Sequence, residues 1–185
     1  PAAGDVFQLK VTLHGTKPPV WRRVLVDGAS TLDQAHEVIQ AAFGWNHTHM
    51  HEFIASDGER YGSSDPFDAM EGVTSGEKIQ LMTVLRTATL NYVYDFGDYW
   101  EHRIKVEKTH APDPQIQLPL CTGGANATPP DDCGGVPGYE EFVQAMADPN
   151  DSEHNHLAEW IGANTWDPTA FDSIEVNDRL AEIKL

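Results

Sequence analysis

Three histidines occupy alternate positions, His47, His49 and His51, at the start of an apolar segment. Side chains alternate between the two faces of a β-strand, so on a strand these imidazoles would share one face. Imidazole suits zinc, copper, iron or nickel. A divalent metal site is therefore one hypothesis, with His102, an aspartate or a cysteine as a further ligand. The alternative is that His49 packs beside Phe53 while the other two hydrogen-bond or face water.

A second group of polar and aromatic residues fills the segment from Asp95 to His102. A strand over residues 100–106 would place His102 on the buried face, where both ring nitrogens need nearby partners. One interpretation is a satisfied core histidine beside a turn whose aspartates, Asp95 and Asp98, accept backbone N–H bonds. The other is an acid/base or metal pair of His102 with one of these aspartates, or an acidic turn paired with Arg22. The candidate polar cluster comprises His49, His51, Asp95, Asp98 and His102.

The two cysteines, Cys121 and Cys133, lie in a segment rich in proline and glycine. Zinc sites normally use closely spaced cysteine pairs, and neither cysteine has a near partner. We expect unreactive thiols that anchor this loop, and a Cys–His nucleophilic pair is the alternative. Two cysteines are too few for a disulfide framework, and the first residues lack the pattern of an export signal. We therefore expect reduced thiols in a cytoplasm.

Acidic residues dominate the charge, because 29 Asp and Glu stand against 12 Lys and Arg, for a formal net charge of −17. Phosphate binding needs clustered Lys and Arg. Only Arg22 and Arg23 hint at such a cluster, and we expect both to be solvated surface. Nucleic acid and anionic membranes are therefore disfavoured as partners, and a basic protein partner fits better. No apolar stretch approaches the about 20 residues that span a bilayer.

The pattern of apolar residues predicts the elements that position these groups. Residues 6–13 alternate cleanly, and residues 20–26 read as the returning strand of a hairpin. Ser30 or Thr31 can cap a helix over residues 32–43, which ends at Gly44 because glycine tolerates a left-handed terminus. We also predict strands at 50–55, 89–94 and 100–106, a loop at 62–77, a short helix at 79–85, and helices at 139–146, 153–161 and 176–183.

This order indicates an α+β protein with a mixed sheet of about five strands and a C-terminal helical segment. A hairpin, a crossing helix and further strands are β-grasp-like. We divide the chain into a sheet domain (1–109), a Pro/Gly-rich ordered loop (110–137) with six of the twelve prolines, and C-terminal helices (138–185) packed on the same domain. His154 and His156, at the start of a late helix, are expected to face solvent.

Five sequence segments occur together in an order typical of one protein family. They are Pro18–Arg23 (PPVWRR), Val38–Trp45 (VIQAAFGW), His49–Phe53 (HMHEF), Tyr94–His102 (YDFGDYWEH) and Pro129–Glu140 (PPDDCGGVPGYE). With these motifs the chain resembles the plasmid pRiA4b ORF-3-like family over nearly its whole length. The resemblance implies a compact α+β domain, an association with plasmids and insertion elements, and no established activity. It therefore implies no catalytic residues.

The chain departs from the family pattern at one position. Members commonly have a cysteine directly before the Pro-Pro-Glu-Asp run, and this chain has Thr128 there. A cysteine-based metal site at that position, if the family has one, would be lost or altered here.

Three functional interpretations follow, and we take the first as the primary hypothesis. It is a non-enzymatic binding or protein-interaction module, because we recognise no nucleophile, phosphate loop or metal signature. A sheet edge or the acidic helical end would contact the partner. The second is a metal-dependent, hydrolase-like enzyme, whose His49, His51 and His102 would have to converge with Asp95 or Asp98. The third is a nucleic-acid accessory factor, which rests on analogy with mobile elements and conflicts with the charge.

Overall fold

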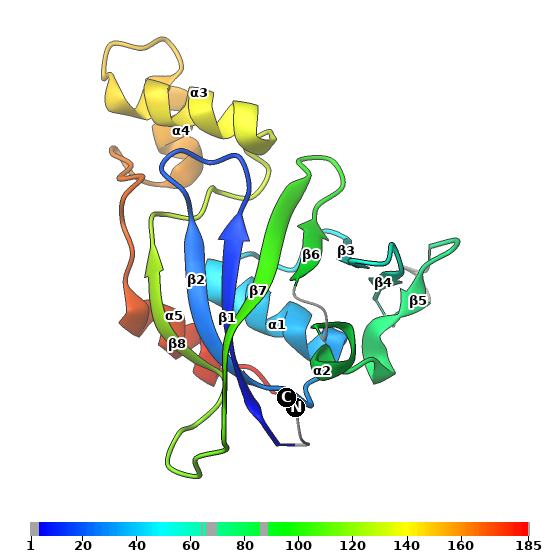
Figure 1. Ribbon diagram of the computed structural model, residues 1–185. Coiled ribbons are helices and arrows are strands. Elements are labelled where there is room, and N and C mark those ends of the chain that lie inside the picture. Colours follow the sequence, from blue (N-terminus) through cyan, green and yellow to red (C-terminus); the bar gives the residue numbers. More distant parts are fainter. Residues whose placement is uncertain (1–3, 64, 66–69, 86–88, 185) are drawn as a thin grey trace.

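An eight-stranded sheet forms the centre of the computed structural model, which describes residues 4–63, 65, 70–85 and 89–184 (Figure 1). The strand order is β5-β4-β3-β6-β7-β1-β2-β8. Neighbours pair antiparallel except β4 and β5, which pair parallel, so the sheet is mixed. The strands are β1 (Val6–Leu13), β2 (Trp21–Asp27), β3 (His51–Ala55), β4 (Arg60–Gly62), β5 (Thr74–Ser75), β6 (Thr89–Tyr94), β7 (Trp100–His110) and β8 (Leu120–Ala125).

The α+β class is confirmed, but the prediction of about five strands is wrong, because β4, β5 and β8 carry no readable periodicity. β4 and β5 have three and two residues, too few to alternate. β8 contains two glycines, which weaken a strand by propensity. It forms because it pairs with β2 at the sheet edge, inside the 110–137 segment expected as a loop. The predicted 62–77 loop lies partly outside the described residues, and its described part includes β5.

Strand β7 carries the side-chain pattern that builds the core. Trp100, His102 and Ile104 are buried, and Arg103 is exposed, as the alternation predicts. β7 pairs with β1 on one side and with β6 on the other, which sets His102 directly opposite Tyr92. The imidazole of His102 therefore lies among the aromatic rings of the core.

Helix α1 (Leu32–Phe43) covers one face of the sheet (Figure 1). A capping box starts it: Thr31 Oγ1 accepts the Gln34 backbone N–H, and the Gln34 side chain accepts the Thr31 N–H. Gly44 ends it in the left-handed conformation, at φ 77°. The predicted helix is confirmed, and the capping residue is Thr31 and not Ser30.

The remaining helices are α2 (Leu81–Val84), α3 (Gly135–Ala147), α4 (His154–Ile161) and α5 (Ser173–Ala181), with a 3-10 turn, η2 (Gly76–Lys78). Helices α3 and α4 pack together at the end of the sheet where β1 turns into β2 (Figure 1). Helix α5 lies beside α1 and β8, where Arg179 Nε–H donates to the Ala41 carbonyl at 2.8 Å. None of the described helices combines the length and apolar character that crossing a bilayer requires.

Candidate functional site

Three segments distant in the sequence meet at His49. They are the residues after α1 (46–50), the turn between β6 and β7 (95–99) and the loop before α3 (131–134). His49 Nε2 lies 3.0 Å from Asp132 Oδ1 and 3.6 Å from Asp95 Oδ2. We call these three residues the His49 cluster. Their ligand-type atoms all lie within 4.8 Å of one another.

The His49 cluster runs from the interior to the surface. The Asp95 side chain is 10% exposed, that of His49 28% and that of Asp132 68%. Behind it, Asp131 Oδ2 accepts the Asn46 backbone N–H at 3.0 Å, while Asp131 Oδ1 is buried without a hydrogen-bond partner among the described residues. Burial raises the pKa of the Asp131 carboxyl above its ordinary value. Asp95 in the cluster and Asp131 behind it therefore both hold carboxylate oxygens that water reaches poorly.

Backbone strain concentrates in the same place. Among the described residues, five non-glycine residues have φ in the left-handed region, and four of them, His47, Asp95, Tyr99 and Asp132, lie in or beside the three segments. Such conformations cost about 1–3 kcal/mol each and gather at functional sites. The turn at His47 also explains why the three alternate histidines do not share a strand face, since β3 begins only at His51.

Hydrogen bonds hold the three segments together. The Asp95 N–H donates to the Met50 carbonyl at 3.0 Å, and the Gly97 N–H donates to Asp95 Oδ1 at 2.8 Å. The Gly134 N–H donates to Asp98 Oδ2 at 3.1 Å. Asp98 thus fixes the loop before α3 and does not belong to the His49 cluster.

A second histidine group consists of His36, His47 and His51. The rings of His36 and His51 stack with 3.6 Å between centroids and 11° between planes, and His47 meets His36 edge-on. His36 Nδ1 lies 2.8 Å from the hydroxyl of buried Tyr92, which also accepts a hydrogen bond from Gln40 Nε2. Burial lowers the pKa of His36 to about 2 and that of His51 to about 4, with neighbouring histidines adding to both shifts. Both rings are therefore neutral at pH 7, and His51 lies outside the His49 cluster.

His102 belongs to the core and not to the His49 cluster. It is fully buried, with Nδ1 at 2.9 Å from the Trp100 carbonyl and 3.3 Å from the Tyr92 carbonyl. On the other side of the ring, Trp45 Nε1–H donates to Nε2 at 3.4 Å. Burial lowers the pKa of His102 to about 3. The ring nitrogens are satisfied without Asp95 or Asp98, so the residues suggested for a hydrolase-like centre do not converge.

Arg22 is buried, although the sequence indicated a solvated pair of arginines. It is 4% exposed, and its guanidinium donates to the carbonyls of Ala42 and Ala125 and to Thr128 Oγ1. Burial lowers its pKa to about 10, which leaves it charged at pH 7. Arg22 therefore joins β2 to α1 and to the segment after β8, and it does not pair with the acidic turn.

The cysteines are free thiols, and one late histidine is more buried than expected. Cys121 is buried in β8, and Cys133 is half-buried before α3. Burial raises the pKa of Cys121 and raises that of Cys133 to about 12, so both are protonated at pH 7. His154 is only 8% exposed, because α4 packs on α3 at this position. Its Nδ1 lies 2.9 Å from the Ala145 carbonyl of α3. His156 is exposed, as expected.

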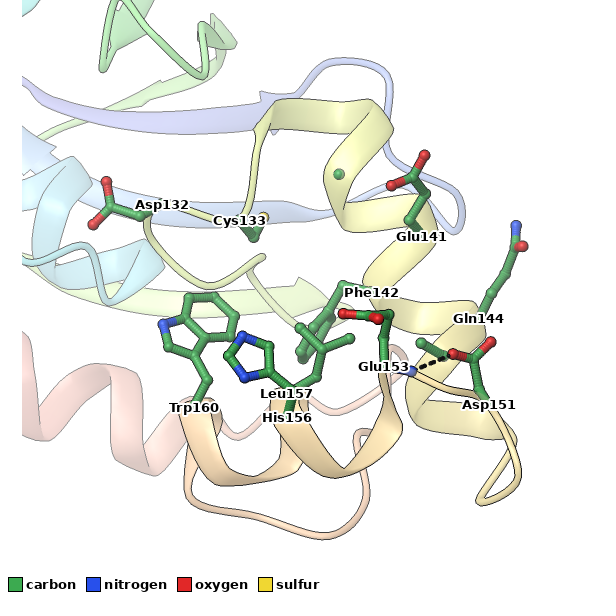
Figure 2. A pocket seen from close by; sticks show the side chains of 12 residues that line it. Asp132, Cys133, Glu141, Phe142, Gln144, Asp151, Glu153, His156, Leu157 and Trp160 are labelled. Atoms are coloured by element: carbon green, nitrogen blue, oxygen red, sulfur yellow. Dashed lines mark hydrogen bonds between the residues drawn. The ribbon is translucent and has the colours of Figure 1, made fainter.

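A groove of about 530 Å³ lies between α3 and α4 (Figure 2). Four carboxylates line it, those of Asp132, Glu141, Asp151 and Glu153. Within the part of the chain that the structure describes, no lysine or arginine lines it. Asp132 lies at one end and Asp151 at the other (Figure 2). The groove is therefore strongly acidic, and it shares Asp132 with the His49 cluster.

Aromatic rings from α4 complete the groove. Trp160 and His156 lie one turn apart on the same helix face, and Figure 2 shows their rings side by side. Trp160 is 45% exposed and packs edge-on against Phe142 of α3, with 5.9 Å between ring centroids. Tryptophan faces attract cationic groups. The groove thus combines negative charge with a surface for a cation.

Sequence reasoning found His49 and Asp95 but missed Asp132, Asp131 and His36. Asp131 and Asp132 lie between a Pro-Pro and a Gly-Gly pair. These pairs indicated a loop of fixed shape but did not indicate which segments the loop contacts. His36 sits inside a regular amphipathic helix, where one polar residue carries no local signal. The sequence indicated the acidic helical end as a contact surface, but it did not show that Asp132 and Asp151 line one groove with Glu141 and Glu153.

Comparison with known proteins finds similarity over most of the chain. The model of the family described as plasmid pRiA4b ORF-3-like protein matches residues 5–175. An uncharacterised protein, y4hQ of Sinorhizobium fredii (strain NBRC 101917 / NGR234), is 35% identical over 182 residues, which cover 97% of this chain and 92% of that protein. A crystal structure of a protein of unknown function, MM3350 from Methanosarcina mazei Go1, is 31% identical with a TM-score of 0.82 and covers 92% of this chain and 97% of that chain. These descriptions state no activity.

Proposed function

We propose that this chain, which belongs to the plasmid pRiA4b ORF-3-like protein family, is a non-enzymatic binding module that holds a positively charged segment of a partner protein in the α3–α4 groove. Family membership agrees with the resemblance that the motifs indicate. The descriptions of the relatives state no activity, so the proposal depends on the residues of this chain.

The observation that carries the proposal is the pairing of four groove carboxylates with the exposed ring of Trp160. Lysine and arginine side chains combine a positive charge with an apolar stem, so they can pair with the carboxylates and lie on the ring. Each exposed ion pair contributes at most about 1 kcal/mol, and binding therefore needs several at once. The net charge of −17 would also speed the encounter with a basic partner.

The same charges argue against phosphate-bearing partners. Nucleic acid and anionic lipid surfaces would be repelled by the groove and by the chain as a whole. We also propose that the protein acts in the cytoplasm, in the plasmid or mobile-element setting that its family suggests. The free thiols of Cys121 and Cys133 suit a reducing compartment.

Peptide titration tests the proposal directly. A fluorescently labelled peptide rich in lysine and arginine should bind, with anisotropy as the readout, and its affinity should fall as salt rises. An acidic peptide of equal length should not bind. The double variant Glu141→Gln/Glu153→Gln should weaken binding about tenfold or more, because two ion pairs together contribute roughly 1.4 kcal/mol. Trp160→Ala should weaken binding as well.

A matched control separates the groove from bulk charge. The double variant Asp178→Asn/Glu182→Gln removes the same charge from exposed positions on or directly after α5. It should bind the basic peptide with nearly unchanged affinity. Equal losses in both double variants would show a general charge effect and would reject the groove as the binding site.

A further inference from the structure

The distances from His49 Nε2 to the two carboxylate oxygens are close to those between neighbouring ligands of one metal ion. Nitrogen and oxygen ligands lie about 2.0–2.2 Å from a divalent transition metal, so two of them on adjacent positions are ~3.0–3.5 Å apart. His49 Nε2 lies 3.0 Å from Asp132 Oδ1 and 3.6 Å from Asp95 Oδ2. The cluster is therefore close to the dimensions of a metal site.

The direction of these contacts also fits an ion better than a hydrogen bond. His49 Nε2 is buried and makes no hydrogen bond with any described residue, although Asp132 Oδ1 is near enough to accept one. The carboxylate oxygen must therefore lie to the side of the axis along which the ring would donate a proton. A metal ion on that axis would have the carboxylates at its sides, where neighbouring ligands belong.

The local charge favours a cation. The three segments carry Asp95, Asp98, Asp131 and Asp132 and contain no lysine or arginine. Asp95 is 7% exposed, and Asp131 keeps a buried oxygen without a hydrogen-bond partner among the described residues, so water stabilises these carboxylates poorly. A divalent ion would bring two positive charges to these carboxylates.

We propose that His49 Nε2, Asp95 Oδ2 and Asp132 Oδ1 bind a divalent first-row transition-metal ion, represented by Zn²⁺ and Mn²⁺. Imidazole suits the zinc end of this series and carboxylates suit the manganese end. The outer side of the site is open to solvent, because the Asp132 side chain is 68% exposed. Water therefore fills the remaining positions of the ion. The site does not depend on the peptide-binding role of Glu141 and Glu153.

A second histidine–carboxylate group competes for the same assignment. His36, Glu37 and His47 also bring ligand-type atoms within 4.8 Å. This group is looser, with 3.8 Å between His47 Nδ1 and Glu37 Oε1, and His36 Nδ1 is already engaged by the Tyr92 hydroxyl. We therefore assign the ion to the His49 cluster, and the test must distinguish the two groups.

Calorimetric titration of the untagged, chelator-treated chain tests the site. Zn²⁺ and Mn²⁺ are titrated separately at neutral pH, and we expect a single ion to bind per chain and to raise the unfolding temperature. His49→Gln and Asp132→Asn should each lower the affinity about tenfold or more. Asp132 is exposed, so its variant should fold, and near-ultraviolet circular dichroism checks this.

Two controls make the result decisive. His47→Gln removes a ligand from the competing group, and Asp178→Asn removes a distant exposed carboxylate, so both should keep the parental affinity. The proposal is overturned if neither metal binds the parent chain. It is also overturned if His47→Gln abolishes binding while His49→Gln retains it.

Discussion

Gly135 packs directly against the backbone of Asp98, and a Cβ atom at this position would lie 2.5 Å from the Asp98 carbonyl oxygen. Gly135 also has φ 68°, a conformation that side chains disfavour. This contact lets the loop before α3 pack closely on the β6–β7 turn. The hydrogen bond from the Gly134 N–H to Asp98 Oδ2 holds the two segments together. The position of Asp132 beside Asp95 therefore depends on a glycine three residues later.

Gly135→Ala should lower the free energy of unfolding by about 2–4 kcal/mol, because left-handed strain and a backbone clash act together. Gly162→Ala is the matched control, since Gly162 has φ 72° but nothing within 4 Å of a Cβ. Gly162→Ala should lower the free energy of unfolding by only about 1–2 kcal/mol. Urea unfolding measures both, and equal losses would mean that the contact with Asp98 is unimportant.

The protein should lose stability as the pH falls below about 6.5. His36 and His102 stay neutral when folded, with pKa values of about 2 and about 3, while the unfolded chain takes up protons near its ordinary pKa of ~6.5. The unfolded state then binds more protons, so acid favours unfolding. Each of these two histidines should lower the free energy of unfolding by about 2 kcal/mol between pH 7.5 and pH 5. Urea unfolding at both pH values checks this, and equal stability at pH 7.5 and pH 5 would contradict it.

His102→Ala should be destabilising at pH 7.5, by about 3 kcal/mol, because it opens a cavity and leaves Trp45 Nε1–H without its acceptor. The variant should also lose less stability on acidification than the parent chain. Binding of Zn²⁺ should be unchanged, because His102 lies in the core. A loss of metal affinity with normal folding would instead place His102 at the metal site.

Arg22→Lys should lower the free energy of unfolding by about 2–4 kcal/mol. One ammonium group cannot reach the Ala42 and Ala125 carbonyls and Thr128 together. Arg23→Lys is the natural comparison. Arg23 pairs with Glu107 at the surface, and its replacement should cost at most about 1 kcal/mol. Thermal unfolding of both variants measures the difference, and similar values would contradict the buried role of Arg22.

Much of the fold could be predicted from local sequence pattern. The alternation of residues 6–13 and 100–106 predicted β1 and the start of β7, and the capping residue and glycine around α1 marked its ends. These features arise within a few consecutive residues, so the sequence carries them in full. Strand β8 was missed because its glycines disfavour a strand, and contacts with distant segments stabilise it: it pairs with β2, and Cys121 exchanges hydrogen bonds with the Asn177 side chain of α5.

The candidate site was decided by tertiary structure. The sequence by itself determined that His49 and Asp95 lie among polar and aromatic residues, but it placed His47, His49 and His51 on one strand face. The left-handed conformation of His47 breaks that alternation, and His49 lies outside the strand, which begins at His51. Asp132 reaches His49 only because the loop before α3 docks on the β6–β7 turn. Such a contact depends on how distant segments pack, and no local spacing in the chain encodes it.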